Sequence, residues 1–426
     1  MTKSILYCFL IACSFALICQ PVHVSSLKEK TASSSVDIIV ATAGFDTEAR
    51  GKVSKSETNI KEDDTEIDNA NDRADASETE DISEPRDHEC NEMCDVAKTQ
   101  ATRINDEANA ADEKTEAAGN NLASRRVTVK SAANKQPNVI LMLVDDLGYG
   151  DLSSFGHPTS RTPVIDQLAS RSKVFTQFYV TSPVCSPSRA SLLTGRYQVR
   201  SGVYPSVFLP DSIYGMPASE TTIAEMLKTK GYRTMITGKW HLGVGDSGEY
   251  LPTQQGFDDY LGVPYSHDMC PCYGCFPGNL PCYDTCWASN VSCPLFNNTV
   301  ISEQPVDLTT LTERLVQRAK LFLRESVSSE QPFFLYMPFM HVHHPQYSSS
   351  EFEGKSIRGT FGDSLAELDD SVHQIIKQLD DLAVTNDTII FFLSDNGPSM
   401  LRQERGGCSG PLRCGKGTTW EGGVRV

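Results

Sequence analysis

A continuous apolar run that ends in two aspartates constrains the fold of this chain more than any other feature. Residues 138–144 read Asn-Val-Ile-Leu-Met-Leu-Val, and Asp145 and Asp146 follow directly. A run without polar alternation is typical of a strand that is buried on both faces, as in a parallel sheet covered by helices. The run therefore predicts a buried parallel strand that delivers two carboxylates at its C-terminal end.

Helical and strand patterns alternate along the rest of the chain. Helical periodicity marks residues 221–230, 311–326 and 363–382, and strand patterns mark 232–237, 333–343 and 388–393. Polar motifs follow these strands, among them Gly238 to His241 and Ser394 to Gly397. Such alternation predicts an open α/β sheet whose functional site lies beyond the carboxyl ends of the strands.

The strand ends carry side chains with oxygen ligands. The members of this set are Asp145, Asp146, Asp395 and Asn396. Oxygen ligands suit a hard divalent cation such as calcium or magnesium, and not zinc. A pair of aspartates alone also serves as a helix cap or a turn. The second acidic motif after another buried strand favours the metal site.

The segment from Cys185 to Arg196 reads Cys-Ser-Pro-Ser-Arg-Ala-Ser-Leu-Leu-Thr-Gly-Arg. It resembles the signature of the sulfatase family, whose cysteine is converted to formylglycine by an enzyme of the endoplasmic reticulum. One hydroxyl of the hydrated aldehyde would attack sulfur, and loss of the second proton would release sulfate. A buried free cysteine or one half of a disulfide is the alternative. Arg189 would share a face with Cys185 if a helix starts here.

Three further segments offer cationic side chains. Lys239 and His241 are two residues apart, as are His341 and His343, so each pair would share one side of an extended chain. Lys416 lies between glycines, where backbone and ammonium can approach an anion closely. Each segment alone could be a surface lysine, a core histidine or a glycine turn. Together they favour an anion-binding site.

The resemblance to the sulfatase family, and within it to the arylsulfatase A group, extends over residues 137–425. It rests on the cysteine motif and on the segments 145–152, 238–245, 262–268, 341–345, 395–398, 405–410, 413–419 and 421–425. It implies a central mixed α/β sheet of the alkaline-phosphatase type flanked by helices, followed by a smaller antiparallel C-terminal domain. The chain ends at Val426, so we expect the catalytic domain, 137–426, to be incomplete and that C-terminal domain to be missing.

The resemblance also implies which residues hold the metal and the nucleophile. Calcium, with magnesium as the less favoured ion, would be held by Asp145, Asp146, Asp395, Asn396 and the modified Cys185. Arg189 and Lys239 would stabilise the formylglycine hydroxyls. The site would therefore contain one calcium ion per chain beside residue 185.

The same resemblance assigns the remaining polar residues to proton transfer and sulfate binding. His241 would take the proton that lets the covalent sulfate adduct collapse. His343 and Lys416 would bind sulfate and assist departure of the alcohol, and Ser266 would donate a hydrogen bond to a sulfate oxygen. His344 should face away from its neighbour on an extended strand, so we assign it no role.

The N-terminal part predicts entry into the secretory pathway. Residues 1–25 carry Lys3 and an apolar run over 5–19, which predicts a signal peptide and is short for a membrane anchor. Residues 26–136 are acidic and poor in aromatics, which predicts a disordered leader. The formal net charge of −17 argues against nucleic acid as a general partner.

Cysteine usage points to an oxidising compartment. Six of the 14 cysteines lie between residues 270 and 293, which favours disulfides over zinc ligation. The resemblance implies the pairs Cys272–Cys286 and Cys275–Cys282, with Cys270–Cys293 as an outer pair. Sequons at Asn290, Asn297 and Asn386 predict glycosylation. These features suit the lysosome or the cell exterior.

Three functions from different classes fit the sequence. The first is a calcium-dependent arylsulfatase, modified by the formylglycine-generating enzyme and acting on aryl, sugar or glycolipid sulfates. The second uses the same formylglycine on phosphonates or phosphodiesters. The third is a catalytically silent, secreted protein that binds sulfate or a partner. The match around Ser266 favours the first, and the sequence makes no prediction of oligomeric state.

Overall fold

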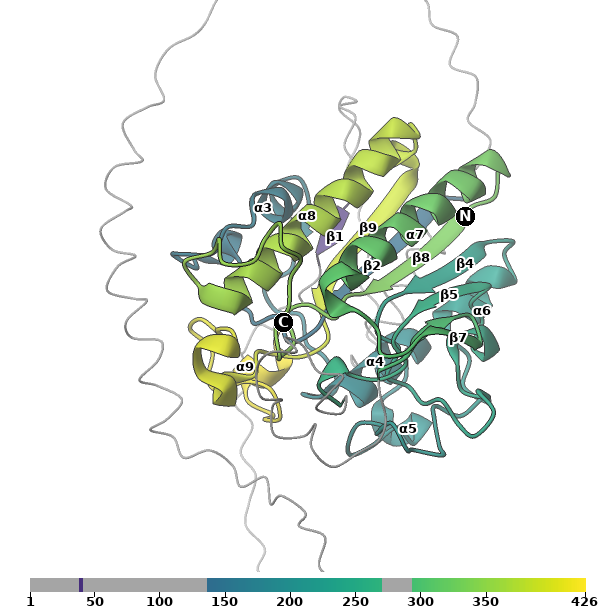
Figure 1. Ribbon diagram of the computed structural model, residues 1–426, viewed down its shortest axis with the longest axis horizontal. Helices are drawn as coiled ribbons and strands as arrows, with labels where there is room; N and C mark the ends of the chain where they lie inside the picture. The colour runs from purple at the N-terminus through teal and green to yellow at the C-terminus, as the bar shows by residue number, and fades with distance from the viewer. Residues whose placement is uncertain (1–37, 41–135, 270–292) are drawn as a thin grey trace, which may run out of the picture.

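A mixed sheet flanked by helices forms the centre of the protein (Figure 1). The computed structural model describes residues 38–40, 136–269 and 293–426. In these ranges the sheet has nine strands in the order β3-β1-β9-β2-β8-β4-β5-β6-β7. The strands are β1 Ile38–Val40, β2 Asn138–Val144, β3 Lys173–Val174, β4 Arg233–Thr237, β5 Asp259–Gly262, β6 Leu295–Asn297, β7 Val300–Glu303, β8 Phe333–Pro338 and β9 Thr388–Ser394. The predicted α/β class is confirmed.

Strand β2 occupies the middle of the sheet and is buried along its whole length. It pairs in parallel with β8 on one side and β9 on the other, while β6 and β7 are antiparallel at the far edge. Its alternate residues belong to two different cores. Ile140 and Met142 join one core, and Leu141 and Leu143 join the other. The apolar run therefore lacks alternation because helices cover both faces of the strand.

The two faces carry different helices. The α-helices are α3 Pro163–Ser170, α4 Cys185–Thr194, α5 Gln198–Ser201, α6 Ile223–Lys228, α7 Leu308–Ser328, α8 Gly359–Asp381 and α9 Glu421–Val424. Helices α7 and α8 run side by side over one face, with α3 beyond them (Figure 1). Helices α4 and α6 contribute Ala190, Leu193, Ala224 and Leu227 to the core of the opposite face. Helices α7 and α8 thus each bury one apolar stripe against the sheet, whereas α4 is buried over most of its length.

One predicted strand is too long. The sequence predicted a strand over 333–343, but β8 ends at Pro338 and the histidine motif lies in the following turns. The apolar pattern continues past the end of the strand, because Phe339, Met340 and Val342 are buried without belonging to the sheet ladder. Hydrophobicity alone therefore does not mark where this strand ends.

Part of the predicted N-terminal organisation can be located. Ile38–Val40, inside the predicted disordered leader, form β1 between β3 and β9, so the prediction of disorder is wrong for these residues. The rest of the leader, the predicted signal peptide and Cys270 to Cys286 lie outside the described residues. Within the described ranges, no helix has both the length and the apolar character needed to cross a membrane.

Candidate active site

The predicted site residues converge at the carboxyl ends of three parallel strands. Asp145 and Asp146 follow β2, Lys239 follows β4, and Asp395 follows β9. Cys185 is the first residue of α4, which packs beside them. All five side chains are buried. The carboxyl ends of parallel strands meet at one edge of a sheet, which brings together residues up to 250 positions apart.

Cys185 lies between charged groups of both signs. Its Sγ is 3.5 Å from Oδ1 of Asp145, 3.7 Å from Nζ of Lys239 and 3.6 Å from Nζ of Lys416. Burial raises the pKa of the thiol far above its ordinary value, although the two lysines oppose this. An unmodified Cys185 would therefore stay protonated and would be a weak nucleophile.

Asp145 is paired with two cations. Lys239 donates to its Oδ2 at 2.5 Å, and Nη2 of Arg189 lies 3.5 Å from the same oxygen. Burial alone would raise the pKa of Asp145, but Lys239, His343 and Arg189 outweigh burial and hold that pKa well below the ordinary value. Asp145 is therefore a carboxylate at neutral pH.

Asp395 and Arg189 form a bidentate pair. Nε and Nη2 of Arg189 lie 2.9 and 2.8 Å from Oδ2 of Asp395. Arg189 stands one turn after Cys185 in α4, so the predicted helix and shared face are confirmed. Burial and the neighbouring Asp145 raise the pKa of Asp395 to about 6. Arg189 thus connects the helix of Cys185 to the end of β9.

Asn396 leaves one buried oxygen without a protein partner. Its Nδ2 donates to Oδ1 of Asp146 at 2.7 Å, whereas its Oδ1 has no hydrogen-bond partner among the described residues. A buried amide oxygen rarely stays unsatisfied. Beside two carboxylates, this oxygen fits a set of ligands for a hard cation.

The carboxylates also belong to a group that could hold a metal ion. Asp145, Asp146, Cys185 and His343 offer ligand atoms that lie within 4.8 Å of one another. His343, which the sequence assigned to sulfate, therefore lies at the predicted metal site, with its Nε2 3.6 Å from Oδ2 of Asp146. The donors present fit a bound divalent cation.

The histidine motif departs from the prediction. His341 and His343 were predicted to share one side of an extended chain, and this is wrong because the segment turns. Nε2 of His341 lies 2.8 Å from Glu367 in α8, away from the acidic cluster. His344 was predicted to face away from its neighbour, but its ring stacks on His343 with centroids 4.7 Å apart. Burial and His343 lower the pKa of His344 to about 3.

His241 reaches the site from a strained backbone position. Its φ of 58° lies in the left-handed region, so the backbone leaves the extended conformation at this residue. Burial, Lys239 and Arg189 lower the pKa of His241 well below its ordinary value. Lys239 also donates to Oγ of Ser266 at 3.1 Å, which places Ser266 beside the cluster.

Lys416 closes the site from a separate loop. Its Nζ lies 2.6 and 2.9 Å from the two carboxylate oxygens of Asp146. Burial opposes its charge, but Asp146 more than compensates and keeps the pKa of Lys416 well above the ordinary value. Lys239 and Lys416 therefore present positive charge on two sides of Cys185.

Sequence reasoning assigned no role to Asp268. This residue is partly buried beside His343 and His267, which hold the pKa of its carboxyl far below the ordinary value against the effect of burial. Asp268 ends the segment 262–268 that supported the resemblance. Its distance in sequence from His343 gave no signal, because Asp268 and His343 come together only in the folded chain.

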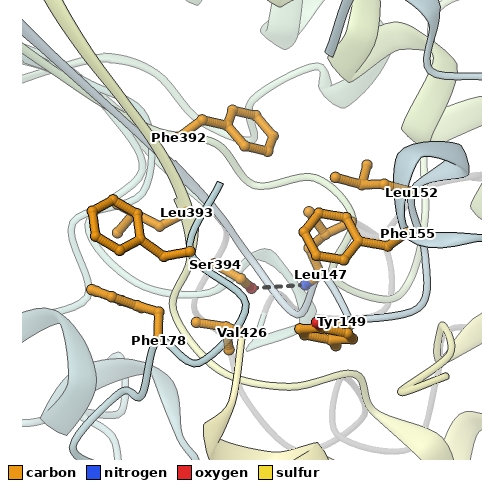
Figure 2. Close-up of a pocket in the computed structure, with 11 residues that line it drawn as sticks. Leu147, Tyr149, Leu152, Phe155, Phe178, Phe392, Leu393, Ser394 and Val426 are labelled. Atoms are coloured by element: carbon orange, nitrogen blue, oxygen red, sulfur yellow. Dashed lines mark hydrogen bonds between the residues drawn. The ribbon is translucent and has the colours of Figure 1, made fainter. Parts of the chain in front are cut away.

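An apolar pocket next to the strand ends differs from this charged cluster (Figure 2). Leu147, Phe155 and Phe178 line it together with Val426, and none of the lining side chains carries a charge. Figure 2 also shows the backbone nitrogen of Leu147 donating to the Ser394 hydroxyl at 3.1 Å, which ties the ends of β2 and β9 together. An anion would be stabilised at Cys185 and not in this pocket.

The predicted modifications fall on both described and undescribed residues. Asn297 and Asn386 are exposed, as a glycan requires, and Asn290 lies outside the described residues. Cys293 is disulfide-bonded. The predicted pairs of Cys272 and Cys275 fall outside the described residues.

Comparisons with known proteins agree with this geometry. The family model described as Sulfatase matches residues 137–426. Arylsulfatase A of Bos taurus is 50% identical over 296 residues, which are 69% of this chain and 58% of that protein. N-acetylgalactosamine-6-sulfatase of Rattus norvegicus is 39% identical over 307 residues, with 69% and 56% covered. This chain thus spans less than two thirds of these relatives.

A solved structure supports the fold as well. The crystal structure of Ps i-CgsB in complex with k-i-k-neocarrahexaose is 32% identical, with a TM-score of 0.58. The match covers 68% of this chain and 64% of that chain. The likeness therefore includes most of the described sheet and helices.

Proposed function

This chain belongs to the sulfatase family, and we propose that it hydrolyses sulfate monoesters through a covalent adduct at residue 185. The observation that carries the proposal is the position of Cys185 between the ammonium groups of Lys239 and Lys416. A sulfate ester is an anion that repels nucleophiles, so a site for it needs positive charge around the attacking atom.

Two groups that the unmodified chain lacks, a formylglycine at residue 185 and a bound calcium ion, would supply the nucleophile and the Lewis acid. A formylglycine there would supply a hydroxyl nucleophile, and a calcium ion would act as a Lewis acid toward it and toward a sulfate oxygen. The ion would be held by the oxygens of Asp145, Asp146, Asp395 and Asn396. The buried Oδ1 of Asn396, which has no hydrogen-bond partner in the part of the chain that the structure describes, supports this ligand set.

The cationic side chains bind and orient the sulfate. Lys416 and Lys239 neutralise its equatorial oxygens, and Ser266, held by Lys239, donates a hydrogen bond to one of them. Arg189 holds the hydroxyls at residue 185 in register from the same helix. These groups are set in place before reaction, so they do not need to reorganise in the transition state.

Proton transfer is assigned to the two histidines. His241 is neutral, because its pKa is well below the ordinary value, and it can accept the proton whose loss ejects sulfate. His343, next to Asp146, assists departure of the alcohol together with Lys416. Each histidine thereby acts on one of the two steps.

The substrate class follows from the relatives and from the site. The relatives are named for aryl sulfates and for N-acetylgalactosamine 6-sulfate, and one solved relative holds an oligosaccharide. We therefore assign aryl, sugar or glycolipid sulfates as substrates. The sequons and the predicted signal peptide place the enzyme in the secretory pathway, in the lysosome or outside the cell, after modification by the formylglycine-generating enzyme.

The test is mass spectrometry of the peptide that contains residue 185, combined with turnover of a small aryl sulfate. We expect formylglycine at 185, and we expect Cys185→Ala to abolish turnover while leaving circular dichroism unchanged. Cys408→Ser is the matched control and should retain both formylglycine and activity. Turnover in Cys185→Ala, or formylglycine without any sulfatase activity, would overturn the proposal; the latter result would indicate a silent sulfate-binding protein.

A further inference from the structure

The ring of His241 is held by a main-chain carbonyl. Its Nε2 lies 3.0 Å from the carbonyl oxygen of Phe208, while its Nδ1 is buried and has no hydrogen-bond partner among the described residues. A carbonyl oxygen only accepts hydrogen bonds, so Nε2 must carry the proton. Nδ1 is then the unprotonated nitrogen, and it is the one that can accept a proton.

The segment around Phe208 is weakly held by its own side chains. Phe208 packs against one core, but Leu209, Ile213 and Tyr214 are exposed, and the segment contains no helix or strand. Such a segment does not keep a carbonyl at a defined position through packing alone. A hydrogen bond from a rigid element is needed to fix it.

Ser186 supplies that hydrogen bond. The backbone nitrogen of Phe208 donates to Oγ of Ser186 at 3.2 Å. Ser186 is fully buried in the first turn of α4 and follows Cys185 directly, so its position is set by the same helix that presents the nucleophile. One helix turn therefore controls both the attacking residue and, through Phe208, the orientation of the base.

We propose that Ser186 is a positioning residue that fixes the Nε2-protonated tautomer and the orientation of His241 through the backbone of Phe208, whose N–H contacts Ser186 and whose carbonyl contacts His241. The expected change in kcat rests on the proposed function. The expected tautomer and orientation of His241 do not. The tautomer is a property of the folded chain and can be measured without turnover.

The structural test is nuclear magnetic resonance of the protein labelled with ¹⁵N at histidine, with the His241 signals assigned by their loss in His241→Gln. In the wild-type chain we expect a single tautomer with the proton on Nε2. In Ser186→Ala we expect this signal to broaden or divide between tautomers. Ser186→Thr keeps the hydroxyl and should restore the wild-type signal.

Matched variants separate this role from a general loss of packing. Ser191→Ala removes another buried hydroxyl of α4, one without a hydrogen-bond partner among the described residues, and should leave the His241 signals unchanged. Phe208→Ala keeps the backbone N–H and the backbone carbonyl of residue 208, so it should also keep the tautomer of His241. Of these three variants, only Ser186→Ala should change the tautomer of His241.

The kinetic test measures kcat per molecule that contains formylglycine, since Ser186 also lies in the modified motif. We expect Ser186→Ala to lower this kcat about tenfold or more with little change in KM, as a misoriented base predicts. A wild-type His241 protonated on Nδ1, or identical His241 spectra in wild type and Ser186→Ala, would overturn the proposal. An inactive wild-type chain with the expected tautomers would instead refute only the sulfatase function.

Discussion

The ammonium group of Lys416 lies 2.6 Å from Oδ1 of Asp146, although 270 residues separate them in the chain. The same ammonium is 3.6 Å from Sγ of Cys185. Lys416 therefore neutralises a carboxylate of the candidate metal site and faces the nucleophile position at the same time. Its charge is maintained in a buried place because Asp146 stabilises it.

Replacing Lys416 by methionine should lower kcat for an aryl sulfate by roughly 10²-fold, because one positive group next to the developing charge is lost. Steady-state kinetics measure kcat, which is then divided by the fraction of molecules that contain formylglycine. Lys377→Met removes an exposed ion pair with Asp381 in α8 and is the control, with no expected change in kcat. A Lys416→Met enzyme with wild-type kcat would contradict the assignment of Lys416.

Replacing Asn396 by leucine should abolish stabilisation by calcium. The change removes the Oδ1 that has no partner among the described residues, at nearly constant side-chain volume. Removal of Asp395 would instead also take from the buried Arg189 the carboxylate that lies nearest to it. Calcium at about 100 times its Kd should stabilise the wild type by about 2.7 kcal/mol and the variant by much less.

Thermal unfolding with calcium and with a chelator measures this difference, and elemental analysis measures the bound metal. Asn386→Gln, at an exposed asparagine, is the control and should keep the calcium effect. Equal calcium content in Asn396→Leu and wild type would show that this amide is not a ligand.

Asp369 in α8 caps the first turn of α3. Its Oδ1 accepts from the backbone nitrogens of Val164 and Ile165 at 3.1 and 2.9 Å. Asp369→Ala should lower the free energy of unfolding by about 1–2 kcal/mol, as expected for loss of a helix cap. Denaturant unfolding measures this, with Asp370→Ala as a neighbouring control. An effect of Asp370→Ala as large as that of Asp369→Ala would argue against the cap.

His157 should make the fold sensitive to acid. Burial and the nearby Arg358 lower the pKa of His157 from its ordinary value of 6.5 to about 4. Its Nδ1 accepts from the backbone nitrogens of Thr159 and Ser160, a role that protonation of Nδ1 would end. Between pH 6.5 and 4 the unfolded chain binds the proton and the folded chain does not, so stability falls as pH falls through this window.

His157→Asn should remove this contribution while leaving an acceptor for the same backbone groups. We expect the wild type to lose about 1 kcal/mol more than the variant between pH 7 and 4, a modest figure because the ring is partly exposed and screened by water. Urea unfolding at several pH values measures the difference. Parallel pH curves for the two proteins would exclude His157 as a source of acid sensitivity.

Much of the fold could be predicted from local patterns. The run at 138–144 and the periodic segments at 311–326 and 363–382 correspond to β2, α7 and α8, because burial on one or both faces leaves a direct trace in the sequence. The end of β8 left no such trace, since buried apolar residues continue beyond Pro338. A strand ends where the neighbouring strands stop forming backbone hydrogen bonds with it, and local sequence does not show this point.

The sequence predicted which residues belong to the candidate site, but not which of their side chains contact one another. Asp145, Cys185 and Lys416 were recognisable by residue type and by motif, and all lie within one cluster. The orientations of His341 and His344 were predicted from an extended chain and were wrong. The turns after β8 direct His341 to Glu367 and stack His344 on His343.

The sequence by itself determined the buried strand, the helix that begins at Cys185 and the kinds of side chain at the strand ends, because these depend on residues near one another in the chain. The tertiary structure alone decided that Arg189 pairs with Asp395 and that Ser186 accepts from the backbone N–H of Phe208. It also decided that Oδ1 of Asn396 has no partner within the described ranges. Those contacts join segments 22 to 250 residues apart, and only the order of strands in the sheet and the course of the connecting loops bring such segments together.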